Sequence, residues 1–167
     1  MKIQLLDPKM PIPAYATGGA AAFDVRSVEP TFTLFAGEQR LVRLGFKVAV
    51  PQGYGGLLLA RSGNAHRLRL SFGNGVGLID SDYRGEVCAL LRNDNEAGTK
   101  AVTIHTYDRI GQFVVVPILR PELEVAESLD DTERGEGGFG STGLVDGDRL
   151  LVQMDLSGYT PACRCSV

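Results

Sequence analysis

The sequence predicts an all-β domain, a sandwich or barrel with at most one short helix. Its apolar runs are short and rich in Val, Ile, Leu, Thr and Phe, and Gly, Pro and Asp interrupt them at close intervals. Helical periodicity is almost absent. Roughly ten short strands of this kind favour a sandwich or a barrel. A chain of 167 residues fits one domain with a core of its own.

The strands follow one another along nearly the whole chain. Residues 1–8 have a strand-like pattern, and residues 40–50 and 67–72 alternate polar and apolar side chains, as antiparallel strands with one solvent-facing side do. Further strands are expected at residues 53–60, 87–92, 101–106, 109–119 and 149–154. Only residues 62–66 are expected to form a helical turn, because a hydroxyl there could cap the amides that follow.

The composition changes toward the C-terminus. Residues 121–131 are acidic, and residues 134–143 are rich in glycine with one aromatic residue, which is typical of a linker that feeds a mobile arm. We therefore expect a β domain over residues 1–131, a glycine-rich arm over residues 132–143 and an extension of unknown role over residues 144–167.

Charge and cysteine content exclude several classes of protein. A net charge of −3 disfavours binding to a nucleic-acid polymer, although a local basic pocket could hold one nucleotide. The chain has no apolar run of membrane-spanning length and no secretory signal, so no membrane partner is expected. Three cysteines are too few for a disulfide framework, which favours the cytoplasm. Together with His66 and His105 they make no recognised zinc spacing.

Residues 74–87 have the composition of a tight hairpin that could bind a ligand. Gly75 and Gly77 would let a ligand approach bare backbone. Asp80 and Asp82 lie two residues apart, so on a strand both carboxylates would point to the same face and could share a water, which suits a general base. The alternative is an ordinary hairpin with aspartates in its turn and Tyr83 at its rim, and the hairpin alone favours this alternative.

Three shorter segments could bind phosphate or metal. The sequence Arg61-Ser62-Gly63 follows an apolar strand and could hold phosphate oxygens through a guanidinium, a hydroxyl and free amides. Asp24 would suit a hydrated Mg²⁺ held mainly by substrate phosphates, or it could be a turn carboxylate paired with Arg26. Gln112 lies within a hydrophobic strand and needs a partner, either a backbone group or a ligand.

Residues 134–143 contain the spacing G-x-G-x-x-G, which kinases and Rossmann enzymes use at phosphates. Too few residues follow Gly143 for a kinase catalytic loop, and no helix pattern follows for a Rossmann site. The segment could still fold over a triphosphate and stack an aromatic ring on a base. A disordered glycine-rich linker is the alternative.

Together these five segments resemble, in order and spacing, the five motifs of the homotrimeric dUTPase family, from about Ala20 to Gly143. Residues 77–85 match the third motif most closely, and residues 134–143 match the fifth nearly as well. The resemblance implies a β jelly roll of the β-clip type and hydrolysis of dUTP to dUMP and pyrophosphate with Mg²⁺. It also implies a homotrimer with three shared active sites, in which the arm of one subunit reaches a neighbour's site.

The resemblance also implies individual roles. Asp80 would orient and deprotonate the water that attacks the α-phosphorus, Tyr83 would pack beneath the deoxyribose, and Asp24 would hold Mg²⁺ through water. Asn74 and the hairpin backbone would bind uracil by its hydrogen-bonding edge, Phe139 would stack on it, and most of the other residues would grip the phosphates. The implied substrate-binding residues are Arg61, Ser62, Gly63, Asn74, Gly77, Tyr83, Gln112, Arg134, Phe139, Gly140, Ser141 and Thr142.

The chain departs from the usual motifs at five positions. Ala22 replaces a usual glycine, Val25 a usual leucine, Ala60 a common proline, Asn64 a common leucine and Gly111 a usual alanine. The second and fourth motifs contain three of these changes, so the phosphate grip is where we expect this chain to differ from its family.

Two other functions are compatible with the motifs. The related dCTP deaminases share the fold and much of the second motif, so a deaminase or a bifunctional dCTP deaminase/dUTPase is the nearest alternative. A nucleotide-gated protein-binding module is the second. In that case residues 144–167, which extend beyond the point where many family members end, would form the surface for a protein partner.

Overall fold

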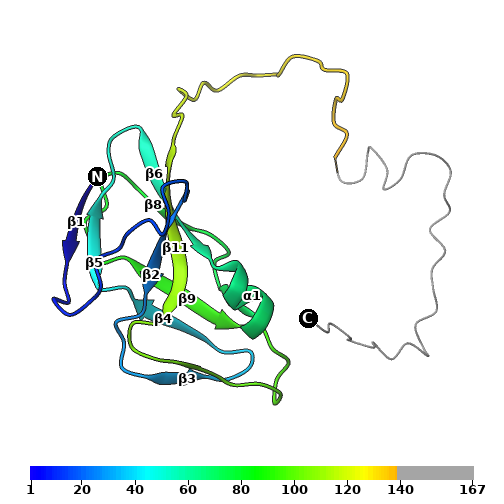
Figure 1. Cartoon of the computed structure of the whole chain (residues 1–167). Coiled ribbons are helices and arrows are strands. Elements are labelled where there is room, and N and C mark those ends of the chain that lie inside the picture. Colours follow the sequence, from blue (N-terminus) through cyan, green and yellow to red (C-terminus); the bar gives the residue numbers. More distant parts are fainter. Residues whose placement is uncertain (139–167) are drawn as a thin grey trace, which may run out of the picture. The chain divides into compact units, whose positions relative to one another are not determined.

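Eleven strands and one short helix lie within residues 1–122 of the computed structural model, which describes residues 1–138 (Figure 1). Residues 123–138 belong to a second unit, and they form turns but no helix or strand. The prediction of an all-β domain with at most one short helix is confirmed for the described part of the chain. No helix within it is long and apolar enough to cross a membrane.

All the strand pairs are antiparallel, and they form two larger sheets and two strand pairs. The four-stranded sheet has the order β2 (Phe23–Arg26), β11 (Arg109–Pro117), β6 (Tyr54–Ala60), β8 (Gly77–Ile79). The three-stranded sheet has the order β4 (Gln39–Arg43), β9 (Cys88–Asn93), β7 (Leu70–Phe72). The two pairs are β1 (Lys2–Leu5) with β5 (Phe46–Ala49), and β10 (Val102–Ile104) with β3 (Phe32–Leu34).

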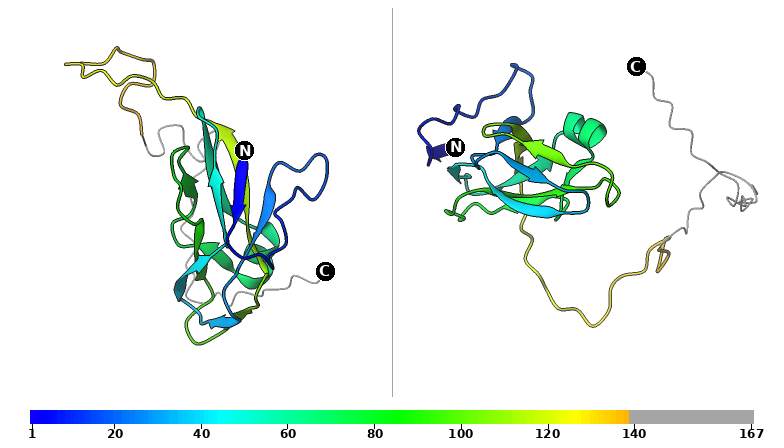
Figure 2. Two further views of the ribbon diagram at one scale, coloured as in Figure 1. Left: turned by 90° about the vertical axis from the view of Figure 1, so that its left-hand side faces the viewer. Right: turned by 90° about the horizontal axis from the view of Figure 1, so that it is seen from below.

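One hydrophobic core lies between the two larger sheets (Figure 2). The four-stranded sheet contributes Phe23 and Phe113, whose rings stack at 5.2 Å, and the three-stranded sheet contributes Val42 and Leu91. Buried and half-buried residues alternate along β2, as expected for a strand with one face on the core. A Cβ at Gly56 would collide with the Phe113 ring, so glycine at this position of β6 makes room for the aromatic core.

Two of the expected strands are interrupted. Residues 40–50 form two strands, β4 and β5, with a break at Gly45. Gly45 has φ +71°, and a Cβ there would collide with Val28, so the chain turns at a position that only glycine suits. Of the strand predicted at residues 67–72, only β7 is correct, because residues 67–68 end helix α1 (Ser62–Leu68) and Arg69 has φ 53°.

Helix α1 confirms the helical turn predicted at residues 62–66 and extends it by two residues. The predicted capping by a hydroxyl is wrong, because the N-cap is Arg61 and no side chain caps the helix. The first amides of α1 therefore have no side-chain partner, and a ligand could take them.

The described part of the second unit contains two turns. Gly135 N donates to Thr132 O at 3.0 Å, and Gly137 N donates to Arg134 O at 3.0 Å. The strand expected at residues 149–154 and the extension over residues 144–167 lie outside the described residues, and the boundaries proposed at residues 131 and 143 stay predictions.

Candidate active site

A pocket of about 310 Å³ brings together the predicted residues of three motifs. We call it the Asp24 pocket. Asp24 comes from the first motif, Arg61, Ser62 and Gly63 from the second, and Gln112 from the fourth; the remaining lining residues are Ala16, Ala22 and Arg109. Sequence separations of up to 88 positions are thus closed within residues 1–122.

The strand register explains why these residues meet. On β11, Gln112 pairs with Asp24 of β2 on one side and with Leu59 of β6 on the other. Arg61 directly follows β6 and starts α1, so it lies next to Gln112 across the sheet. Gln112 Nε2 donates to Ala60 O at 3.1 Å, which answers the question of its partner: a backbone group satisfies it, and its side chain still lines the pocket.

The Asp24 carboxylate lies between two guanidinium groups. Its Oδ1 is 2.8 Å from Arg61 Nε, and its Oδ2 is 3.1 Å from Arg109 Nη1. The alternative pairing with Arg26 is wrong, because Arg26 Nη1 donates to Tyr107 O at 2.8 Å and Asp24 lies within β2 rather than in a turn. Two cations around one anion leave the pocket with a net positive charge and several free N–H donors, which suits an anionic ligand.

Arg109 is a pocket residue that the sequence analysis did not single out. On a regular strand, residues 109 and 112 would point to opposite faces. The register shifts between Arg109 and Gly111, so Ile110 is an extra residue in β11, and Arg109 turns to the face of Gln112. The signal in the sequence was the pair of apolar residues Ile110 and Phe113, both buried and three positions apart in a strand.

Gly63 lies on open space, since a Cβ there would meet nothing within 4 Å. Packing inside the protein therefore does not require glycine at this position. A ligand that approaches the first turn of α1 closely would require it, as the resemblance implied.

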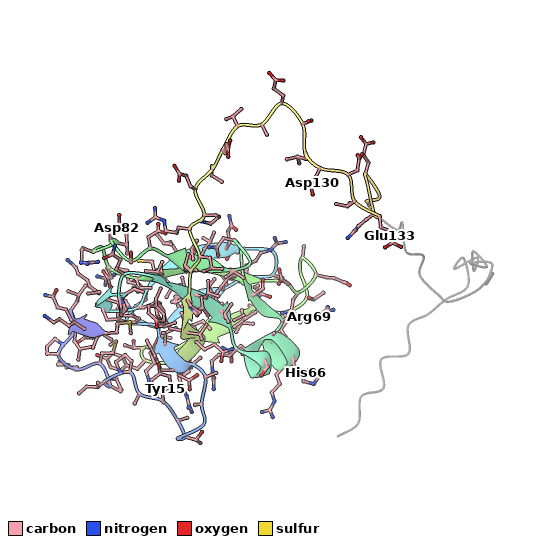
Figure 3. All side chains as sticks on the ribbon, turned by 90° about the horizontal axis from the view of Figure 1, so that it is seen from above. Tyr15, His66, Arg69, Asp82, Asp130 and Glu133 are labelled. Carbon is pink, nitrogen blue, oxygen red and sulfur yellow. The ribbon has the colours of Figure 1, made fainter. Side chains whose placement is uncertain are left out.

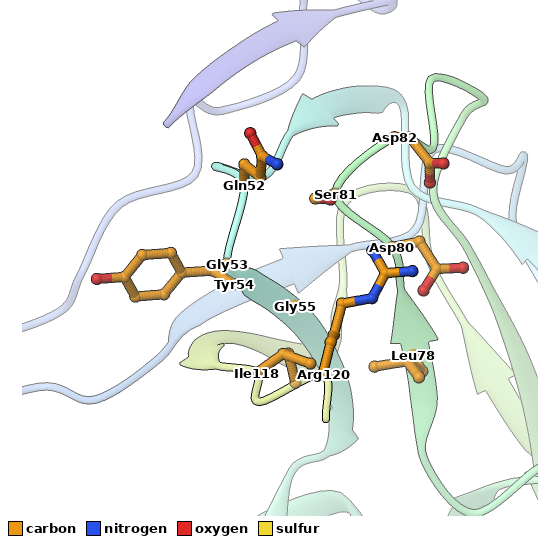
Figure 4. Close-up of a pocket in the computed structure, with 10 residues that line it drawn as sticks. All are labelled: Gln52, Gly53, Tyr54, Gly55, Leu78, Asp80, Ser81, Asp82, Ile118 and Arg120. Atoms are coloured by element: carbon orange, nitrogen blue, oxygen red, sulfur yellow. The ribbon is translucent and has the colours of Figure 1, made fainter. Parts of the chain in front are cut away.

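The hairpin carries the third motif, with its aspartates beyond the strand. β8 ends at Ile79, and Tyr83 N donates to Asp80 O at 3.2 Å to close a turn. The argument that Asp80 and Asp82 share a strand face is therefore wrong. Both are exposed, and both line a second pocket of about 480 Å³, the Asp80 pocket (Figure 4). Figure 4 also shows Arg120 extending along this pocket toward Asp80.

The Tyr83 ring is held in one position. Its hydroxyl donates to Glu86 O at 2.9 Å, and a Cβ at Gly85 would collide with the ring. The ring is 42% exposed, so one face is free to contact a ligand. Asn74 is exposed and has only a 3.4 Å contact from Nδ2 to Val76 O, which leaves its amide available. A Cβ at Gly77 would lie 3.1 Å from Leu58 Cβ, so glycine lets the hairpin lie close to β6.

The Asp24 pocket and the Asp80 pocket share no residue and lie at opposite ends of β6. Ile79 pairs with Gly56, so Asp80 lies beside Gly55, whereas Arg61 follows the other end of the strand. At about 3.3 Å per residue, roughly 20 Å separates them. Figure 3 shows the same separation between Asp82 of the hairpin and His66 of α1. One chain does not bring its predicted base to its own phosphate-binding residues.

The residues predicted for the fifth motif fall in the second unit or beyond the description. Arg134 Nε donates to Gly137 O at 2.8 Å, so its guanidinium braces a turn. Phe139, Gly140, Ser141 and Thr142 lie outside the described residues, and their roles stay predictions.

The described residues limit how a metal could bind. Residues 1–138 hold no group of three or more His, Cys, Asp or Glu side chains that could enclose a metal ion. Asp24 offers one carboxylate in a phosphate-sized pocket, and Mg²⁺ typically binds through one or two carboxylates, several waters and substrate phosphates. The donor set fits an Mg²⁺ of that kind.

The sequence model of the dUTPase family matches residues 8–143. This chain belongs to the dUTPase family. A deoxyuridine 5'-triphosphate nucleotidohydrolase of Paraburkholderia phymatum is 41% identical over 147 residues, which are 86% of this chain and 97% of the relative. One from an Anaeromyxobacter species is 46% identical over 136 residues, 81% of this chain and 90% of the relative.

Solved structures of dUTPases are similar to this one. The dUTPase of Staphylococcus bacteriophage 80alpha with dUpNHpp superposes with a TM-score of 0.79 at 28% identity, covering 86% of this chain and 98% of that chain. A phage dUTPase of S. aureus, described with a structural Mg(II) ion, has a TM-score of 0.68 at 25% identity, covering 76% of this chain and 96% of that chain. The predicted jelly roll of the β-clip type is thereby confirmed.

Proposed function

We propose that this dUTPase-family protein hydrolyses dUTP to dUMP and pyrophosphate, with Mg²⁺ and with active sites shared among three copies of the chain. The observation that carries the proposal is the Asp24 pocket, where residues of three dUTPase motifs surround a positively charged hollow. Relatives that match most of the chain carry the name deoxyuridine 5'-triphosphate nucleotidohydrolase.

The Asp24 pocket binds the triphosphate. Arg61 and Arg109 each keep free N–H donors after pairing with Asp24, and these donate to phosphate oxygens. The uncapped first turn of α1 adds backbone amides, and the Ser62 hydroxyl adds one donor. Asp24 also holds the hydrated Mg²⁺ through water, and the ion, when bound, neutralises charge on the phosphates.

The hairpin supplies the base and the selectivity. Asp80 takes a proton from water as the water oxygen attacks the α-phosphorus, and the bond from that phosphorus to the bridging oxygen breaks to release pyrophosphate. The exposed face of Tyr83 packs beneath the deoxyribose and leaves no space for a 2′-hydroxyl. Asn74 donates to uracil, and the glycines beside it let the base approach the backbone.

The separation of the two pockets supports a shared site. A gap of about 20 Å along β6 is longer than a triphosphate chain, so Asp80 and Arg61 of one chain do not act on one nucleotide. Closed rotational symmetry lets Asp80 of one copy meet the Asp24 pocket of another. A homotrimer also lets the arm, with Arg134 and the four residues that follow Gly138, close over a neighbour's site. We place the protein in the cytoplasm, because its three cysteines are too few for a disulfide framework.

Product analysis on a nucleotide panel tests the proposal. The protein is incubated with Mg²⁺ and dUTP, UTP, dTTP or dCTP in turn, and nucleotide products, pyrophosphate and ammonia are quantified. We expect dUMP and pyrophosphate in equal amounts from dUTP, with little turnover of the others. Ammonia released from dCTP would support the deaminase or bifunctional alternative instead, and no turnover of dUTP would refute the proposal. A protein partner bound through residues 144–167 would be tested separately by deleting them.

A further inference from the structure

Asn64 joins the helix of the Asp24 pocket to the strand that carries Arg109. Its side chain is half-buried on α1, and Nδ2 donates to Arg109 O at 2.9 Å. Asn64, Arg61 and Arg109 also line a hollow of about 290 Å³ beside the Asp24 pocket. Leucine is common at this position of the second motif, and leucine has no donor for that carbonyl. The bond is thus a feature of this chain.

The bond lies where the sheet ends. β6 stops at Ala60, which pairs with Gly111, so no residue of β6 lies opposite Arg109. Arg109 also directly precedes the extra residue that interrupts the register with β2. Backbone at a bulge has fewer ladder bonds than backbone in a regular strand. On the side of α1, the Asn64 amide therefore takes the place of a strand neighbour and holds the Arg109 backbone.

The consequence falls on the two guanidinium groups. Arg61 is the N-cap of α1, so the helix that fixes Arg61 also fixes the Arg109 backbone through Asn64. Asp24 joins the two side chains at their tips. We propose that Asn64 is a positioning residue for triphosphate binding, which sets the spacing of Arg61 and Arg109 so that both contact one phosphate chain. This inference rests on the proposed function.

The test compares Asn64→Leu with a matched control, Asn95→Leu. Asn95 Nδ2 donates to Leu68 O at 2.9 Å, so it ties the other end of α1 with the same kind of bond but does not touch Arg109. We expect Asn64→Leu to raise the Kd of a non-hydrolysable dUTP analogue and the KM of dUTP about fivefold, the factor typical of one hydrogen bond. We expect kcat to change less than twofold, and inhibition by 2′-deoxyuridine, which has no phosphate, to stay unchanged.

The control and a second background separate positioning from loss of stability. Asn95→Leu should lower the thermal midpoint at least as much as Asn64→Leu and leave KM unchanged. In an Arg109→Gln background, Asn64→Leu should add little to KM, because Asn64 acts through Arg109. An unchanged KM in Asn64→Leu, an equal rise in Asn95→Leu, or additive effects with Arg109→Gln would each overturn the inference. Failure of the unsubstituted protein to hydrolyse dUTP would instead refute the proposed function.

Discussion

Two inactive variants should restore each other if Asp80 and Arg61 act on the same nucleotide from different chains. Asp80→Asn removes the base, and Arg61→Gln removes a phosphate donor about 20 Å away on the same chain. In a trimer that contains both variants, each site takes Asp80 from one copy and Arg61 from another. Going round any such trimer, one of the three sites receives both intact residues, so we expect about one third of the unsubstituted activity.

The assay needs trimers of defined composition. The two variants are coexpressed with different affinity tags, and trimers that carry both tags are isolated by two successive columns. Pyrophosphate release from dUTP is then measured against doubly tagged unsubstituted protein. Doubly tagged trimers made only of Asp80→Asn chains serve as the negative control. Activity of mixed trimers no higher than that control would refute the reasoning, since a site contained within one chain gains nothing from mixing.

Three further predictions follow from particular contacts. Gly85→Ala should push the Tyr83 ring aside, because the added Cβ occupies its place, and should lower the ratio of kcat/KM for dUTP over UTP; an unchanged ratio would contradict the role of that ring. Asn93→Leu should cost about 3 kcal/mol of unfolding free energy in urea titrations, since this fully buried amide makes four hydrogen bonds, and a cost below about 1 kcal/mol would contradict that role. Backbone and Tyr107 hydroxyl donors lower the pKa of Asp7, so its stabilisation is present above the unfolded pKa and lost as pH falls through the folded one; Tyr107→Phe should shift acid unfolding slightly to higher pH, and circular dichroism would detect an unshifted midpoint.

The sequence predicted those parts of the site that depend on local composition. Asp24, Arg61 and Gln112 stood in recognisable segments, and antiparallel register brought them together. Arg109 was missed because its side chain faces the pocket only after a bulge, and a bulge leaves almost no mark in the alternation of residue types.

The same limit applies to the strand predictions. Period-2 alternation at residues 67–72 favoured a strand, yet Leu68 ends a helix and packs partly against the core from there. The aspartates of the hairpin were placed on a strand face for the same reason, although β8 ends one residue before Asp80. Alternation over six residues or fewer does not fix where an element ends, because the backbone hydrogen bonds that end it come from distant strands.

The Asp24 carboxylate acts as a tethered competitor in the absence of nucleotide. It occupies donors of both guanidinium groups from a fixed position, so its effective concentration at them is far higher than that of a free anion in solution. Inorganic phosphate or sulfate must displace it with phosphate contacts alone. A deoxynucleotide brings sugar and base contacts as well, so the pocket discriminates against small anions before any base is recognised.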